Sequence, residues 1–200
     1  SHLLNLHSTY AVLLYNLSIT GNLLYILGEV MKSTSHFAMA HLVQASLQNR
    51  GIVLNSSAFA YGNIAPDYIP SMVLTPHFSK VCERKIREIS HELSTTPLNE
   101  SGPVNAEYSK MLGILCHYIC DYFCSAHSKD FISGFKGHVE FENALDAFIN
   151  QNCMQLLDVD GSDTVIPSRY VDGLISRVDR QKKLYCEGGY TFENDMCFAF

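Results

Sequence analysis

The chain has 200 residues, of which 47% are apolar and 17% charged, and its formal net charge is −6. This length and composition predict one ordered globular domain with a sizeable core and exclude a disordered chain. The acidic net charge argues against a nucleic-acid partner, because neutralising phosphates needs clustered lysine and arginine. No basic patch interleaved with aromatic residues is present.

The amino-terminal segment differs in composition from the rest of the chain. Residues 1–28 lack Asp, Glu, Lys and Arg, although polar residues interrupt the apolar ones throughout. No apolar run reaches the 18 residues of a membrane span, and no basic region precedes the longest run as in a secretory signal. The first methionine is Met31. We therefore predict that residues 1–30 are an appended or upstream segment and that residues 31–200 form the domain.

Apolar residues recur at spacings of three and four along most of residues 31–200, which predicts helices. The expected helices cover residues 36–48, 78–93, 107–126, 138–157, 170–184 and 193–200, with loops at 94–106 and 158–168. The last helix stops without a cap, which suggests a truncated carboxyl terminus. No segment shows sustained strand alternation, so the predicted fold is an all-α, multi-helix domain.

Prolines and glycines are expected to interrupt this pattern. Pro66 and Pro70 should prevent one long helix and should bias Ala65 and Ile69 toward extended geometry. A further break is expected around Gly134 and Gly137, before the helix that begins at residue 138.

The stretch LGILCHYICDYFCSAH, residues 112–127, carries the clearest chemical signal. His117 and Asp121 are four residues apart, so they lie on one helix face roughly 5–6 Å apart at Cβ. His127 follows Asp121 by six residues, a rotation of about 240° on an ideal helix. It can share their face only if the helix ends or kinks, and we expect it to serve a different ion.

Two further pairs complete the pattern. Asp67 and His77 flank a turn that contains proline, and His138 and Glu142 are again four residues apart. Each pair alone is weak evidence, but the ordered set D–x9–H, H–x3–D–x5–H and H–x3–E is far more specific. Apolar neighbours surround these groups, and burying charges is costly unless a metal compensates them. The sequence therefore predicts two neighbouring metal sites.

This pattern closely resembles the zinc-dependent phospholipase C family, whose all-α fold is shared with P1-type nucleases and with part of GPI-specific phospholipase D. The resemblance covers about residues 35–157. It implies one zinc held by Asp67, His77, His117 and Asp121, and a second held by His127, His138 and Glu142. Family members bind a third zinc through an early histidine, the shared aspartate and the mature amino-terminal residue, which implies His36 and Asp121 here.

The resemblance implies hydrolysis of a phosphodiester, in particular of a phospholipid headgroup, by metal-activated water. Asp67 is then both a metal ligand and the proton acceptor, and Tyr68 and Tyr61 are the candidate substrate-binding residues. Two zinc ions are expected and a third is left open, because the tryptophan that supplies the amino terminus in secreted relatives is missing. Leu74 replaces another expected aromatic residue, so choline specificity is unsupported. The alternatives are a catalytically weak zinc-binding protein and a P1-like single-strand nuclease.

The remaining histidines and the cysteines have simpler interpretations. His41 competes with His36, but the two are about 140° apart on an ideal helix, and the family pattern favours His36. His2, His7 and His91 lack partners at ligand spacing. Cys116, Cys120 and Cys124 stack on one helix face and are interpreted as packing, with zinc ligation as the alternative.

Partners and location complete the prediction. A phospholipid or other phosphodiester is the expected partner, with transient membrane-surface contact left open and no protein partner predicted. The unpaired cysteines and the missing signal favour a cytoplasmic location over secretion.

Overall fold

The structure is a computed structural model that describes residues 32–73, 75, 77–97, 103–131, 134–152, 154–155 and 171–200. Its elements are α2 (Lys32–Asn49), α3 (Ser56–Tyr68), α4 (Pro70–Val73), α5 (Ser79–Thr95), α6 (Ala106–Tyr122), the 3-10 turn η1 (Ser125–His127), α7 (Gly134–Asn152), α8 (Val171–Gly188) and α9 (Phe192–Ala199). All regular elements in these ranges are helical, which confirms the all-α prediction. The predictions for residues 1–30, for Leu74 and for the loop at 158–168 lie outside the described residues.

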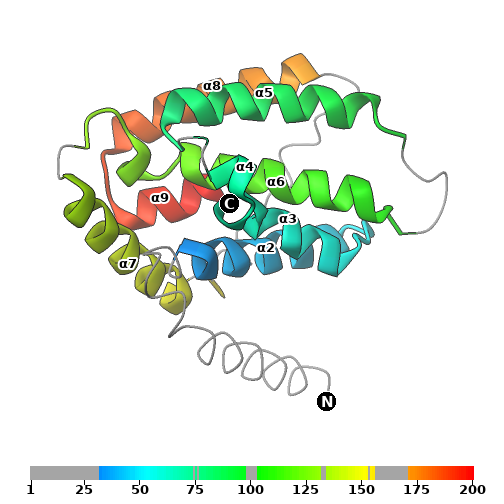
Figure 1. Cartoon of the computed structure of the whole chain (residues 1–200), viewed down its shortest axis with the longest axis horizontal. Coiled ribbons are helices and arrows are strands. Elements are labelled where there is room, and N and C mark those ends of the chain that lie inside the picture. Colours follow the sequence, from blue (N-terminus) through cyan, green and yellow to red (C-terminus); the bar gives the residue numbers. More distant parts are fainter. Residues whose placement is uncertain are drawn as a thin grey trace.

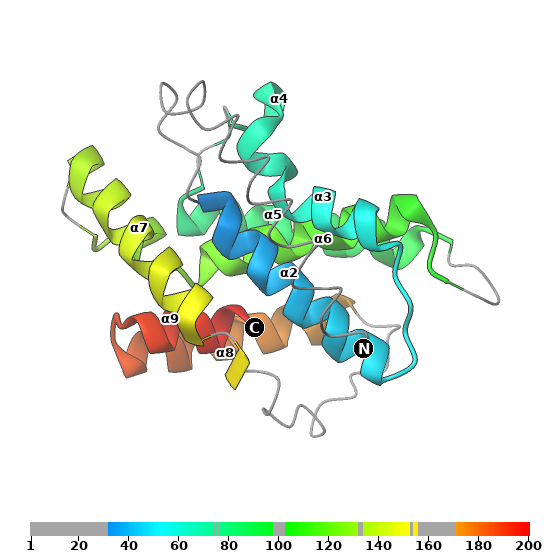
Figure 2. The ribbon, with the colours of Figure 1, turned by 90° about the horizontal axis from the view of Figure 1, so that it is seen from below.

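Helix α6 is the central element, with α3 and α5 packed against it (Figures 1 and 2). One apolar cluster joins α6 to α5 and α8 through residues that include Ile86, Leu115 and Tyr185. A second cluster joins α2, α7 and α9 through residues that include Met39 and Leu145. The metal-ligand candidates on α6 therefore lie between two packed layers. In the described part of the chain, no helix is both long enough and apolar enough to cross a membrane.

The contact between α3 and α6 depends on two glycines. A Cβ atom at Gly62 would lie 2.1 Å from the carbonyl oxygen of Lys110, and one at Gly113 would lie 2.2 Å from that of Phe59. Only glycine permits this approach, because real Cβ atoms essentially never come so close to backbone. The crossing brings the backbone of α3 next to the face of α6 that carries His117, one helical turn beyond Gly113.

Helix α6 ends earlier than the sequence predicts. Its last residue is Tyr122, and Phe123 has φ −98° and ψ 11° before the chain enters the turn η1. The ammonium of Lys182 donates a hydrogen bond to the carbonyl oxygen of Tyr122, which satisfies an acceptor left open at the helix end. His127 therefore lies beyond the end of α6, as expected from its rotation of about 240° relative to Asp121 on an ideal helix.

Three other local predictions were wrong: extended geometry at Ala65, a helix break around Gly134 and Gly137, and the end of the following helix at residue 157. Ala65 is helical, and Pro66 lies inside α3, although a proline there removes one bond of the helix; Pro66 is fully buried, and packing of α3 against α6 outweighs this cost. Ile69, by contrast, is extended with ψ 119° and confirms its prediction. Helix α7 begins at Gly134 and includes Gly137, and it ends at Asn152 instead of residue 157. Packing of its apolar face outweighs the modest helix cost of glycine.

Candidate metal centre

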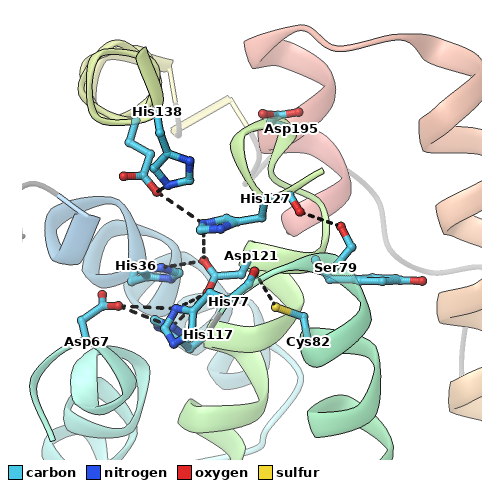
Figure 3. A network of polar contacts seen from close by, with 12 residues as sticks. His36, Asp67, His77, Ser79, Cys82, His117, Asp121, His127, His138 and Asp195 are labelled. Carbon is cyan, nitrogen blue, oxygen red and sulfur yellow. Dashed lines mark hydrogen bonds and ion pairs between the residues drawn. The ribbon is translucent and has the colours of Figure 1, made fainter. Parts of the chain in front are cut away.

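The predicted metal ligands come together from six segments at one end of α6 (Figure 3). Helix α6 supplies His117 and Asp121, and α7 supplies His138 and Glu142; His36 comes from α2, Asp67 from α3, His127 from η1, and His77 from the segment before α5. All of them are buried except His77 and His138, which are partly exposed. Residues far apart in the sequence therefore form one compact site.

Asp121 is the centre of this site, as Figure 3 shows. Its Oδ2 lies 2.9 Å from Nδ1 of His77 and 3.1 Å from Nε2 of His117. Its Oδ1 lies 3.3 Å from Nε2 of His36 and 3.4 Å from Nε2 of His127. One carboxylate thus faces four imidazoles, two on each oxygen.

Glu142 forms a second, smaller centre. Its Oε1 lies 2.9 Å from Nε2 of His138 and 3.3 Å from Nε2 of His127. His127 therefore lies between the two carboxylates and connects the two centres. His127 therefore contacts the carboxylates of both centres, whereas the sequence predicted that it would serve a separate ion.

Three groups of candidate ligands have donor atoms within 4.8 Å of one another. They are His77 with His117 and Asp121; His127 with His138 and Glu142; and His36 with Asp67 and His117. The first two match the ligand sets that the family resemblance implies, although Asp67 is grouped with His36. In the residues described, none of these groups includes a cysteine.

The orientation of His117 is fixed by the neighbouring helix. Its Nδ1 lies 2.8 Å from the carbonyl oxygen of Asn63 on α3, and a carbonyl oxygen can only accept, so Nδ1 carries the proton. In the neutral ring, the other nitrogen, Nε2, then presents a lone pair to the site. The close crossing at Gly62 and Gly113 is what brings Asn63 within reach.

The position of the proton on His117 indicates whether a metal ion fits the site. The lone pair of His117 Nε2 faces Oδ2 of Asp121 at 3.1 Å, and both atoms are buried. Two electron-rich atoms repel each other unless a proton or a cation lies between them. Burial, together with His36, lowers the pKa of His117 and so disfavours the extra proton. A divalent cation therefore fits the donor set, with histidine and carboxylate ligands of the kind that zinc prefers.

Electrostatics also keep the central carboxylate ionised. Burial opposes ionisation of Asp121, but the surrounding imidazoles, through the charge of His127 and a hydrogen bond from His36, hold its pKa well below its usual range. An ionised carboxylate can supply both oxygens to cations on its two sides. The rings of His36 and His117 stack at a centroid distance of 3.9 Å, which packs the early histidine directly against this group.

Some predicted residues lie outside the cavity. A cavity of about 50 Å³ is lined by Asp67, Asp121 and other ligands, but neither Tyr61 nor Tyr68 lines it. Tyr61 is 47% exposed and lies under the ammonium of Lys110 at 5.3 Å, whereas Tyr68 is 38% exposed and follows Asp67 directly. The volume suits ions and a few waters.

His41 and the cysteines do not join the metal groups. His41 packs edge-on against Phe37 at 4.5 Å, and burial lowers its pKa. Burial raises the pKa of Cys116 to about 12 and that of Cys120 and Cys124 well above the usual value, so these thiols stay protonated. Cys124 and Cys120 pack in the apolar cluster of α2, α7 and α9, and Cys116 packs against the cluster of Ala40, Leu54 and Phe59, which supports the packing interpretation.

The cavity also includes residues that the sequence pattern did not reveal. Its apolar wall contains Met39, Leu145, Ile149 and Ala199, and Ser35 and Asp195 supply further polar groups. Ser35 donates a hydrogen bond to Asp146, which follows Glu142 by four residues and extends the same face of α7. The spacing of four residues from Glu142 could have identified Asp146 as a residue near the site. No pattern in the sequence around Asp195 identified that residue.

Comparison with known proteins gives one match. No curated protein and no solved structure matches the chain significantly. A family model described as zinc-dependent phospholipase C matches residues 35–190, which is most of the chain and includes every ligand candidate named above. The chain therefore belongs to the zinc-dependent phospholipase C family.

Proposed function

We propose that the chain hydrolyses the headgroup phosphodiester bond of a phospholipid with water activated at a zinc centre. The observation that carries this proposal is Asp121, a buried carboxylate that faces four imidazoles, of which His117 presents a lone pair to it. Family membership supports a zinc-dependent hydrolase and a phospholipid substrate. The headgroup itself is not specified by any residue in the site.

Two zinc ions are proposed. Asp67, His77, His117 and Asp121 would hold one ion, and His127, His138 and Glu142 would hold the other. His36 lies 3.3 Å from Asp121 Oδ1 and is where a third ion would bind. Bound zinc supplies charge stabilisation for the phosphoryl oxygens and lowers the pKa of water from 15.7 toward about 7.

Asp67 is the proposed proton acceptor. It is 8% exposed, it lines the cavity, and its Oδ1 lies 3.7 Å from His117 Nε2 and 3.8 Å from His77 Nδ1. Asp67 would take one proton from the water molecule, and the oxygen of that water would attack phosphorus. The bond from phosphorus to the diacylglycerol oxygen would break, that oxygen would take up a proton from solvent, and Asp67 would release its proton to solvent, which restores the carboxylate. The products are diacylglycerol and a phosphorylated headgroup.

The test is hydrolysis of mixed phospholipid vesicles, with zinc counted by elemental analysis in the same samples. We expect activity that is lost with chelator and restored by zinc. Asp67→Asn should lower kcat by about 10²–10⁴-fold, the usual contribution of a general base. Asp179→Asn is the control, because Asp179 is an exposed carboxylate that pairs with Arg87 on the surface.

Other results would favour the alternatives. Activity that survives metal removal contradicts the proposal. Bound zinc without hydrolysis of vesicles or of a chromogenic phosphodiester identifies a zinc-binding protein. Cleavage of single-stranded DNA in preference to vesicles identifies a nuclease.

A further inference from the structure

His127 is a ligand candidate with little local support. It is the last residue of η1, a turn of three residues, whereas His117 and Asp121 lie on a helix of 17 residues. Within the turn, the backbone N–H of His127 donates to the carbonyl oxygen of Cys124 at 3.2 Å. A single turn has little stability alone, because helix nucleation is unfavourable. The position of His127 therefore depends on contacts from elsewhere in the chain.

The hydroxyl of Ser79 donates a hydrogen bond to the carbonyl oxygen of His127 at 3.0 Å, and Asp195 on α9 supplies the contacts where the turn begins. Its side chain is 2% exposed, and its Oδ2 accepts a hydrogen bond from the backbone N–H of Ser125 at 2.9 Å. Its Oδ1 accepts from the hydroxyl of Ser125 at 2.6 Å and from the hydroxyl of Tyr185 at 2.7 Å. Ser125 is the first residue of η1, so one buried carboxylate holds both the backbone and the side chain where the turn begins.

The position of Asp195 is itself well determined. Thr191 caps α9 by accepting a hydrogen bond from the backbone N–H of Asn194. The amide of Asn194 donates to the carbonyl oxygens of Tyr185 and Gly189, which ties α9 to the end of α8. Figure 3 shows Asp195 next to the ribbon that carries His127. The hairpin of α8 and α9 therefore fixes the turn from outside the ligand set.

We infer that Asp195 is a positioning residue that holds η1, and through it His127, in place to bind the zinc shared with His138 and Glu142. The inference rests on the proposed zinc centre and extends it with a residue beyond the segment that the family model matches, which ends at residue 190. Groups that orient metal ligands typically raise metal affinity by about 10–100-fold. The effect should be confined to one ion, because the Asn63 contact orients His117 independently.

The experiment measures zinc affinity by competition with a chromogenic chelator in Asp195→Asn, Tyr185→Phe and Ser125→Ala. The matched control is Ser109→Ala. Like Ser125, Ser109 is a fully buried serine with a hydrogen-bonded hydroxyl, although its partners are backbone groups. It lies near the far end of α6, away from the metal centre. We expect Asp195→Asn and Ser125→Ala to weaken one zinc by about 10–100-fold and leave the other unchanged. Tyr185→Phe should have a smaller effect in the same direction, and Ser109→Ala none.

A double-substitution cycle identifies the ion that is affected. In His138→Ala the second zinc is already weakened, so adding Ser125→Ala should cost less than it does in the wild type. Equal weakening of both ions, or no weakening in Asp195→Asn and Ser125→Ala, overturns the inference. If Asp195→Asn does not fold, Ser125→Ala and Tyr185→Phe decide the question. A wild-type chain that binds zinc but hydrolyses nothing refutes the proposed function and leaves this test intact.

Discussion

Asp121 and Glu142 both gather imidazoles, but they are built into the fold in different ways. Asp121 is 4% exposed, lies on the central helix and contacts four histidines. Glu142 lies on α7 and contacts two, of which the His138 side chain is 21% exposed and His127 comes from the turn η1. The Asp121 end is therefore built on the central helix α6, with further histidines from α2 and from the segment before α5, whereas the Glu142 end is built on α7 and the turn η1.

The difference shows what each end requires from the rest of the molecule. The Asp121 end depends on the close crossing of α3 and α6, which lets the Asn63 carbonyl orient His117. The Glu142 end depends on α9, which holds the turn through Asp195. Damage to the helix crossing and damage to the carboxyl-terminal hairpin should therefore affect different ions.

The largest effect should come from removing the shared carboxylate. We expect Asp121→Asn to weaken both zinc ions, by at least about 10²-fold for the ion held with His117, because the amide loses charge and one acceptor oxygen. Glu142→Gln, a matched carboxylate-to-amide change, should weaken only one ion, by about 10–100-fold. Zinc titration of both variants with a competing chelator measures the difference. Full zinc content in Asp121→Asn would refute the shared-ligand arrangement.

A smaller effect should follow from opening the helix crossing. In Gly113→Ala the new methyl group meets the Phe59 carbonyl oxygen at 2.2 Å and other backbone atoms at 3.0 Å, so α3 and α6 must move apart. We expect the free energy of unfolding to fall by about 1–3 kcal/mol, the usual cost of overpacking. The zinc held with His117 should weaken as well, because the Asn63 carbonyl moves.

Chemical denaturation and zinc competition together test this prediction. The zinc at the Glu142 end serves as the internal control, since its ligands come from η1 and α7 and the crossing is formed by α3 and α6. If Gly113→Ala unfolds more easily but both zinc ions weaken equally, the two ends are not mechanically independent.

The sequence predicted which histidines and carboxylates come together better than it predicted what holds them in place. Spacing of four placed His117 and Asp121 on one helix face, and the 240° rotation correctly required a helix end before His127. These are local properties of a helix. Pro66 inside α3 and Gly137 inside α7 were misjudged, because tertiary packing outweighed local propensity. The contacts of Asn63 and Asp195 join residues 54 and 70 positions apart, and no periodicity reveals such pairs.

The smallest predicted effect concerns protons at the Asp121 end of the metal-free protein. Because the pKa of His117 is lowered in the folded state, the unfolded chain binds more protons once the pH falls below the ordinary value of about 6.5. The His117 contribution to stability is therefore fully present above that pH and is lost as the pH decreases toward the lowered pKa. With chelator present, unfolding by urea from about pH 7.5 to about pH 5.5 should show decreasing stability. His117→Gln should remove that part of the pH dependence, and an identical slope in the variant would mean that His117 is not held neutral by burial.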